Sequence, residues 1–254
     1  MYQGFYNLVS GMLTQTRDLN TISNNMVNVQ TSGYKSDTML ARTFDEEMFI
    51  RTGTVSKGNP TELATCSKIV SAQRTYVDYT QGALRETDSI YDFALSGSGF
   101  FCIRTPEGER YTRNGSFSVD ENGYLILNEL GQVLSEDNQP IQITSEDFAA
   151  DGGTFRLDGE TFGTLKVVDF ADYDQLHKED NGLFSTNQAQ IRAMDEIGGG
   201  ETGILWKAVE KSNVNMVDEM TAMMSSQRAL QSAAQVLKMY DQLLAKASTD
   251  IGRL

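Results

Sequence analysis

The chain has 254 residues, 39% of them hydrophobic, and a formal net charge of −14 at pH 7. This length and hydrophobic content support a folded core and exclude a disordered chain. No apolar run approaches the roughly 18 residues that a membrane-spanning helix needs. The first residues lack the basic and apolar parts of a cleavable secretion signal, so we expect any export to follow another route.

The negative charge lies in the middle of the chain. Residues 86–201 carry 7 basic and 23 acidic side chains, a net charge of −16, whereas residues 1–85 and residues 202–254 each have a net charge of +1. An acidic centre without a basic stripe repels nucleic-acid phosphates and anionic lipids. We therefore expect no nucleic-acid binding and no membrane insertion.

Residues 1–35 are predicted to form a long helix that ends at Thr31-Ser-Gly33. Between Met1 and Tyr34 the charged residues are Arg17 and Asp18, and the other polar positions carry amides and hydroxyls, among them Asn24, Asn25 and Asn28. Uncharged polar faces suit burial against several neighbours; the alternative is a helix that is merely short of lysine and glutamate. The predicted apolar seam, interrupted by Gln15, consists of Phe5, Leu8, Met12, Leu19, Ile22, Met26 and Val29.

Residues 36–74 have no clean period and are predicted to be a mostly extended connector. Residues 75–207 are predicted to be a β-rich domain, because short apolar runs alternate with turn signals. Asp120-Glu-Asn-Gly123 between two such runs predicts a hairpin. Many short strands at this spacing predict an antiparallel sandwich or barrel. Gly198-Gly-Gly200 is predicted to be a flexible exit. Further strands are predicted at 99–105, 111–112, 133–134, 141–143, 155–157 and 165–170.

Residues 208–254 contain a second long predicted helix. Asn213 or Asn215 can cap it, and Asp218 and Glu219 lie in its first turn, where the helix dipole favours them. Both helices exceed the usual 11 to 12 residues, so we expect them to pack along their length. The seam of this second helix consists of Met216, Met220, Met223, Leu230, Ala234, Leu237, Leu244 and Ile251.

The residues that usually carry metal or nucleophile chemistry are few. Cys66, Cys102 and His177 are scattered, so we expect neither a zinc site nor a disulfide. His177 lies in a charged segment without a nucleophile beside it. We therefore expect His177 to be a solvated loop residue rather than a member of a catalytic dyad. We expect no catalytic residues, no cofactor and no metal.

Three segments together resemble the signatures of bacterial flagellar rod and hook proteins. The first is similar to "SGM…L…ISNNLANVNTTGYK", the central one to "GxGFF…YTRxGxFxxDxxGxL", and the last to "SNVDLVEEM…QRAY". Val27 and Leu230 depart from the usual alanine and aromatic residue, which weakens the choice among family members. The matching residues are Ser10–Leu13 with Leu19–Lys35; Leu95–Phe101, Tyr111–Phe117 and Asp120–Leu125; and Ser212–Met220 with Gln227–Ala229.

The resemblance implies an α+β fold in which residues 1–35 and 208–254 pair as an inner coiled-coil axial domain, and residues 75–207 form an outer domain. It implies a helical homopolymer in the extracytoplasmic part of the flagellar basal body. It also implies contacts with other rod and hook proteins and with the flagellar type III export apparatus. The residues expected at the assembly interface are Phe5, Leu8, Met12, Leu19, Ile22, Asn24, Asn25, Met26, Asn28, Met220, Met223, Leu230, Leu237 and Leu244.

Chain length and a single modest β domain favour a rod subunit over a hook subunit. A different class remains open, namely a soluble binding module whose helices pair within one chain while the acidic domain captures a basic partner. An enzyme that uses His177 is a third and weaker alternative.

Overall fold

The computed structural model describes residues 2–43, 46–51, 61–67, 70–128, 130–143, 145, 148–157, 160–179, 181–186, 191–193 and 203–251. The chain forms two compact units. The first, called the helical unit here, comprises Met1–Val27, Asp37–Tyr76 and Asn215–Leu254. The second, called the β unit, comprises Asn28–Ser36 and Val77–Val214. The predicted α+β class, with helices from the two ends of the chain and an antiparallel β-rich centre, is confirmed.

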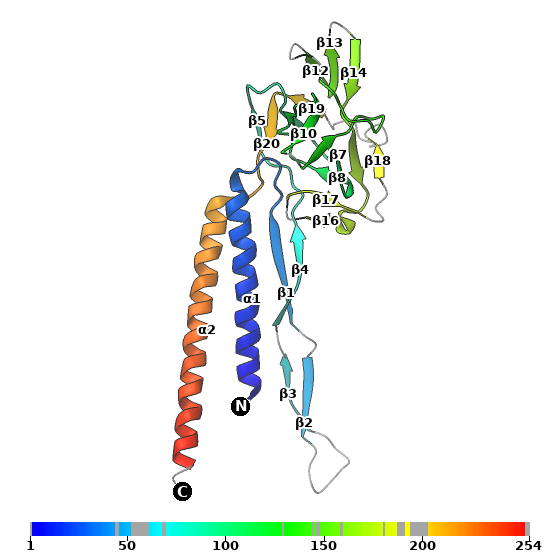
Figure 1. Ribbon diagram of the computed structural model, residues 1–254. Helices are drawn as coiled ribbons and strands as arrows, with labels where there is room; N and C mark the ends of the chain where they lie inside the picture. The colour runs from blue at the N-terminus through cyan, green and yellow to red at the C-terminus, as the bar shows by residue number, and fades with distance from the viewer. Residues whose placement is uncertain are drawn as a thin grey trace. The chain divides into compact units, whose positions relative to one another are not determined.

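The helical unit is built around α1 (Tyr2–Val27) and α2 (Met216–Ile251). The two helices lie side by side and antiparallel, so that both chain ends are at the same end of the pair (Figure 1). Asn215 caps α2, because its side-chain oxygen accepts a hydrogen bond of 3.1 Å from the backbone N–H of Val217. Among the described residues, no helix is both long and apolar enough to span a membrane.

Strands also contribute to the helical unit. β1 (Asp37–Thr43) pairs with β4 (Val70–Val77), and β2 (Glu46–Arg51) pairs antiparallel with β3 (Thr61–Ser67). β1 contacts α1. These strands lie in the segment that was predicted to be a mostly extended connector. The backbone there is extended, but it is paired. Pairing through backbone hydrogen bonds requires no particular side chain, and this segment lacks the alternation that predicts a strand, so the sequence did not reveal the pairing.

The strands of the β unit are short, and their pairings are antiparallel, as predicted. The main sheet has the order β16-β17-β8-β7-β11-β10-β9, and β15 joins it through β7 and carries β18. Its strands are β7 (Phe100–Thr105), β8 (Gly108–Thr112), β9 (Ser118–Val119), β10 (Leu125–Leu127), β11 (Gly131–Val133), β15 (Val167–Phe170), β16 (His177–Lys178), β17 (Phe184–Ser185) and β18 (Ile191–Ala193).

Smaller sheets complete the β unit. β12 (Ala149–Asp151), β13 (Thr154–Leu157) and β14 (Glu160–Thr164) form a three-stranded sheet. β5 (Leu84–Glu86) pairs with β20 (Ala208–Glu210), and β6 (Phe93–Ser96) pairs with β19 (Gly203–Trp206). These last two pairs join the beginning of the unit to its end. Strands of three or four residues carry too little pattern for prediction from sequence.

The predicted hairpin is confirmed. Gly123 adopts a φ of +82°, its N–H donates to the carbonyl of Asp120, and β9 and β10 flank the turn. The strand predicted at 141–143 is wrong, because that segment makes an isolated bridge between Gln142 and Tyr124 instead. The predicted flexible exit at 198–200 lies outside the described residues.

Alternating side chains of β7 supply two cores. Phe101 and Ile103 belong to the larger cluster, whereas Phe100 and Cys102 point to the opposite face and a second cluster. Cys102 is a free, fully buried thiol, and burial raises its pKa well above the ordinary value. It therefore acts as a small hydrophobic residue, as its apolar surroundings in the sequence suggested.

Candidate assembly interface

The contact between α1 and α2 in one chain is largely polar over part of its length. Gln15 donates hydrogen bonds to Ser226 and to Asp18, and the Ser226 hydroxyl donates to Asp18 at 2.7 Å. Gln15 occupies a position of the predicted apolar seam, and the structure places it between the helices. At Gln15 the face of α1 that meets α2 is therefore the one that the apolar spacing indicated.

Asn25 connects three elements of the helical unit. Its side-chain N–H group donates to Glu219 on α2 and to the carbonyl of Asp37 in β1, both at 2.8 Å. Its side-chain oxygen accepts from the Asp37 N–H at 2.9 Å. Asn25 is 2% exposed. Its amide is thus occupied inside one chain, whereas Asn24 is exposed and Asn28 is partly buried.

The predicted seam residues flank the polar contact. Ile22 is buried, while Met220 and Leu244 are exposed. Within one chain, the seam is therefore only partly covered. The partly buried members are Phe5, Leu8, Met12, Leu19, Met26, Met223, Leu230 and Leu237.

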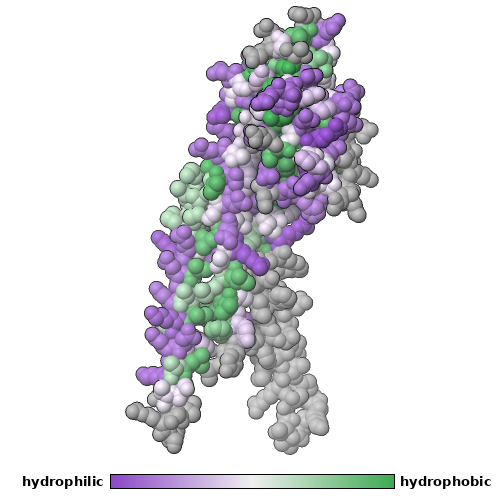
Figure 2. Space-filling view, in the orientation of Figure 1, coloured by the Kyte–Doolittle hydropathy of each residue, from purple (hydrophilic) through white to green (hydrophobic). Residues whose placement is uncertain are grey.

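A set of apolar side chains on the helices is exposed, and all of them except Met220 lie outside the predicted seams. We call these residues the outer stripes. They repeat at intervals of three and four residues and lie close to the predicted seams in the sequence. Because the two patterns have the same spacing, the sequence analysis did not identify the stripes. Figure 2 shows apolar side chains on the helical part of the surface among hydrophilic ones. The stripes are Tyr6, Val9 and Leu13 on α1, and Val217, Met220 and Met224, then Val236, Met239 and Leu243, on α2.

A cleft of about 280 Å³ lies within the helical unit. It is lined by residues of α1, β1 and α2, including the carboxylates of Asp18, Asp37, Asp218 and Glu219. Asp18 and Glu219 accept the hydrogen bonds described above, and Asp218 accepts one from Asn215 at 2.7 Å. Across the described part of the chain, no group of three or more His, Cys, Asp and Glu side chains is arranged to hold a metal ion.

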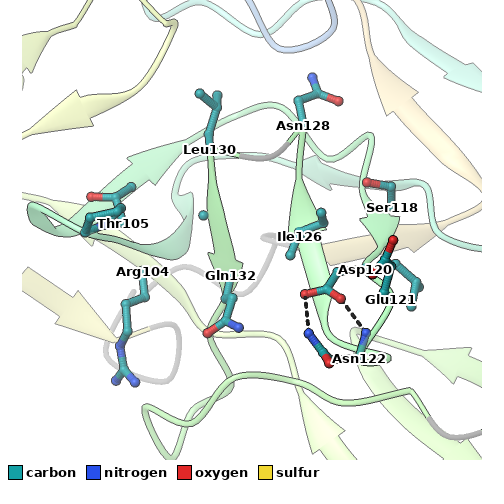
Figure 3. A pocket seen from close by; sticks show the side chains of 13 residues that line it. Arg104, Thr105, Ser118, Asp120, Glu121, Asn122, Ile126, Asn128, Leu130 and Gln132 are labelled. Atoms are coloured by element: carbon teal, nitrogen blue, oxygen red, sulfur yellow. Dashed lines mark hydrogen bonds between the residues drawn. The ribbon is translucent and has the colours of Figure 1, made fainter.

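A broader hollow of about 1120 Å³ lies on the β unit, over an open face of β7, β9, β10 and β11 (Figure 3). Arg104 donates to the Asn138 carbonyl, and Asp120 bonds Asn122 in its own turn (Figure 3). Neither histidine nor cysteine lines this hollow.

His177 lies in the short strand β16 and is exposed. The Ser185 hydroxyl donates to the His177 backbone carbonyl at 3.5 Å, so this contact does not involve the imidazole. The prediction that His177 is solvated is confirmed, although the residue is in a strand rather than a loop.

The β unit contains one buried charge cluster of Lys35, Arg113 and Glu210, whose side chains are at most 4% exposed. Lys35 Nζ lies 2.7 Å from Glu210 Oε1, and Arg113 Nη1 lies 3.4 Å from Glu210 Oε2. Burial lowers the pKa of both Lys35 and Arg113, and the Glu210 carboxylate opposes that change. No pattern in the sequence had brought these three residues together.

Three family models match the chain, in the order expected from the resemblance. Residues 5–35 match the flagella basal body rod protein model, and residues 94–161 match the D1 domain of flagellar hook protein FlgE/F/G. Residues 207–250 match the C-terminal model of the flagellar basal body rod FlgEFG proteins.

Similar proteins extend over nearly the whole chain. Flagellar basal-body rod protein FlgG of Buchnera aphidicola subsp. Acyrthosiphon pisum is 33% identical, over 94% of this chain and 96% of its own. Flagellar hook-basal body complex protein FlhO of Bacillus subtilis is 30% identical over 100% of both chains. FlgG of Bacillus subtilis is 30% identical over 96% of this chain and 97% of its own.

Two long helices from the two ends of the chain, with apolar residues exposed on them, and a β unit of short antiparallel strands are typical of a structural protein. The matches give the particular family. The chain belongs to the flagellar basal-body rod proteins, and it is a structural subunit of the rod.

Proposed function

We propose that this subunit polymerises helically with copies of itself through its terminal helices, and that the polymer is a hollow shaft that transmits torque. The observation that supports this proposal is the exposure of the outer stripes. Leu13 is 56% exposed, Met239 54% and Leu243 66%, although each lies on a regular helix with apolar neighbours at the same spacing. Extended apolar surface of this kind is typical of protein interfaces.

The energetic case is simple. Burying apolar surface is worth about 25 cal/mol per Å², so covering one large apolar side chain is worth roughly 1.5–3 kcal/mol. Several such side chains in one contact outweigh part of the entropy lost on association. The partly buried seam residues, among them Phe5, Leu8 and Met12, would gain further burial in the same contact. In this proposal, seam and stripes together form the coiled-coil packing of the axial domain.

The proposal extends to partners and place. The subunit would be exported by the flagellar type III apparatus without a cleavable signal, and would contact other rod and hook proteins outside the inner membrane. It would require no cofactor and would catalyse no reaction. A hook subunit of the same family is the alternative within this class. Similarity to named rod proteins along 94–96% of the chain supports the rod.

A soluble binding module would expose few apolar residues on its helices. In that case the two helices would cover each other's apolar residues, and the monomer would be complete. Polar contacts through Gln15, Ser226 and Asn25 between the helices, with apolar residues exposed elsewhere, argue against it.

The test combines sedimentation of the purified full chain over a wide concentration range with far-ultraviolet circular dichroism. We expect the wild-type chain to form large assemblies as concentration rises. Leu13→Asp should prevent assembly and leave the folded β unit intact. Arg17→Gln is the matched control, because it changes the net charge by the same amount at an exposed position of the same helix that already carries a charge. A monomer at all concentrations for the wild-type chain would contradict the proposal.

A further inference from the structure

The chain passes between the helical unit and the β unit four times, after Val27, Ser36, Tyr76 and Val214. Any force that is carried along the chain from one unit to the other must pass through these crossings. On the β-unit side, Ser36 lies at one crossing, and Asp78 and Asn213 each lie one residue inside two others. The structure connects these three residues directly.

Asn213 makes these connections with a single side chain. Its amide oxygen accepts from the Ser36 N–H at 2.8 Å, and its amide nitrogen donates to the Asp78 carbonyl at 2.8 Å. The Asn213 backbone N–H donates to the Tyr34 carbonyl, and the Asp78 N–H donates to the Ser36 carbonyl at 2.8 Å. Thr80 offers its carbonyl and its hydroxyl to the same amide nitrogen, at 3.3 and 3.2 Å. Three segments that are distant in sequence are therefore held by one amide.

The buried charge cluster anchors the same three segments. Glu210 lies three residues before Asn213, and its Oε1 accepts from Lys35 Nζ at 2.7 Å and from the Gly82 N–H at 2.9 Å. Lys35 Nζ also donates to the Thr80 carbonyl at 2.7 Å. Because Glu210 is fully buried, pulling any one segment away would leave charged groups without their partners in a dry environment.

The backbones also fit closely at this place. Gly33 has a φ of +67°, and a Cβ atom there would lie 2.3 Å from the backbone of Arg113. A Cβ atom on Gly82 would lie 1.9 Å from the Lys211 carbonyl oxygen. Only residues without a side chain permit these approaches. The entering and leaving segments are thus in direct contact along several residues.

We propose that Asn213, together with the Lys35–Glu210–Arg113 cluster, is a joint that makes the crossing segments share mechanical load. The inference rests on the proposed function, because a subunit that transmits torque is loaded at these crossings. Without the amide of Asn213, Ser36 and Asp78 keep their mutual hydrogen bond, but the third segment is then held by fewer bonds, those of Glu210 and of the Asn213 backbone N–H, and these carry the load without the amide. Hydrogen bonds loaded one after another break at a lower force than bonds loaded together.

The test pulls single molecules of the full-length chain between a handle at the exposed Glu107 in the β unit and one at the exposed Gln231 on α2. We expect Asn213→Ala to lower the first rupture force at least 1.5-fold. The denaturant midpoint should stay close to that of the wild-type chain, because the strands and both cores are untouched. The matched control is Gln142→Ala, which removes an amide bonded to a backbone carbonyl elsewhere in the β unit.

Hydrogen exchange provides a second readout on the intact chain. The Ser36 amide donates to Asn213, so its exchange should become at least 10-fold faster in Asn213→Ala, while the amide of Val133 in β11 should not change. Equal rupture forces in wild type and Asn213→Ala would overturn the proposal. A lower force accompanied by an equal loss of global stability would also overturn it, since that is a merely structural effect. Neither measurement needs a polymer, so failure of the wild-type chain to assemble would count against the proposed function alone.

Discussion

The Lys35 ammonium lies 2.7 Å from the Glu210 carboxylate, although 175 positions separate the two residues. The contact joins the segment that follows the first helix to the segment that precedes the second. Both side chains are at most 1% exposed. This ion pair therefore links the two ends of the β unit.

Glu210→Gln should destabilise the β unit by about 3–5 kcal/mol. The substitution keeps the shape of the side chain but leaves Lys35 and Arg113 as buried cations without a counter-charge. Chemical denaturation of the full chain, followed by near-ultraviolet circular dichroism, measures the change. Glu109→Gln is the control, because the Lys166–Glu109 pair is much more exposed and should be worth about 0–1 kcal/mol. Equal effects of the two substitutions would refute the assignment.

Gly33→Ala should also be strongly destabilising, by about 2 kcal/mol or more. The new Cβ atom would overlap the Arg113 backbone, and the φ of +67° is unfavourable for alanine. Gly11→Ala is the contrasting variant. That glycine lies inside α1, and a Cβ atom there would have no neighbour within 4 Å, so alanine should stabilise the helix by up to about 1 kcal/mol. Thermal unfolding of both variants is measured at a protein concentration too low for assembly. Similar melting temperatures of Gly33→Ala and Gly11→Ala would contradict the prediction.

Alkaline pH should destabilise the β unit between pH 10 and 12. Burial, helped by a hydrogen bond of 2.7 Å to Asp169, raises the pKa of Tyr173 to about 12. The folded state keeps this proton where the unfolded chain has lost it. The resulting stabilisation is complete below about pH 10 and disappears as pH rises through 12. Burial also raises the pKa of Tyr111, which acts in the same direction.

Two measurements check the pH dependence. The free energy of unfolding, measured by urea titration from pH 9 to pH 12, should fall, and the fall should be shallower in Tyr173→Phe by about 1 kcal/mol. The lowered pKa of Lys35 works in the opposite sense, because the unfolded chain holds that proton up to about pH 10.5. A stability that rises steadily over this range would mean that the lysine dominates, contrary to the prediction.

Local signals in the sequence predicted local structure well. The two helices, the Asp120–Gly123 hairpin and the choice of Asn213 or Asn215 as a cap rest on residues that are close in sequence. The structure resolves the last alternative, since Asn215 caps α2 and Asn213 bonds Ser36 and Asp78. Nothing in the sequence separated these two roles, because both residues are asparagines two positions apart.

Distant relationships could not be predicted. Lys35 resembles a surface lysine until Glu210 is placed beside it, and no period or spacing connects them. The helix register illustrates a different difficulty. The apolar spacing on α1 placed Gln15 on the face that meets α2, but it did not show that Asn25, outside the seam, is buried and bonds Glu219 and Asp37. The placement of the seam residues at contacts between copies remains a prediction.

The central claim is that exposed apolar residues of the helices hold copies of the chain together. The most direct measurement is sedimentation velocity of Met239→Asp beside the wild-type chain and the exposed control Gln235→Asp, all at the same concentration. The account predicts large assemblies for the wild type and the control, and a folded monomer with unchanged helix content for Met239→Asp. Assembly of Met239→Asp to the same size as the control would contradict it.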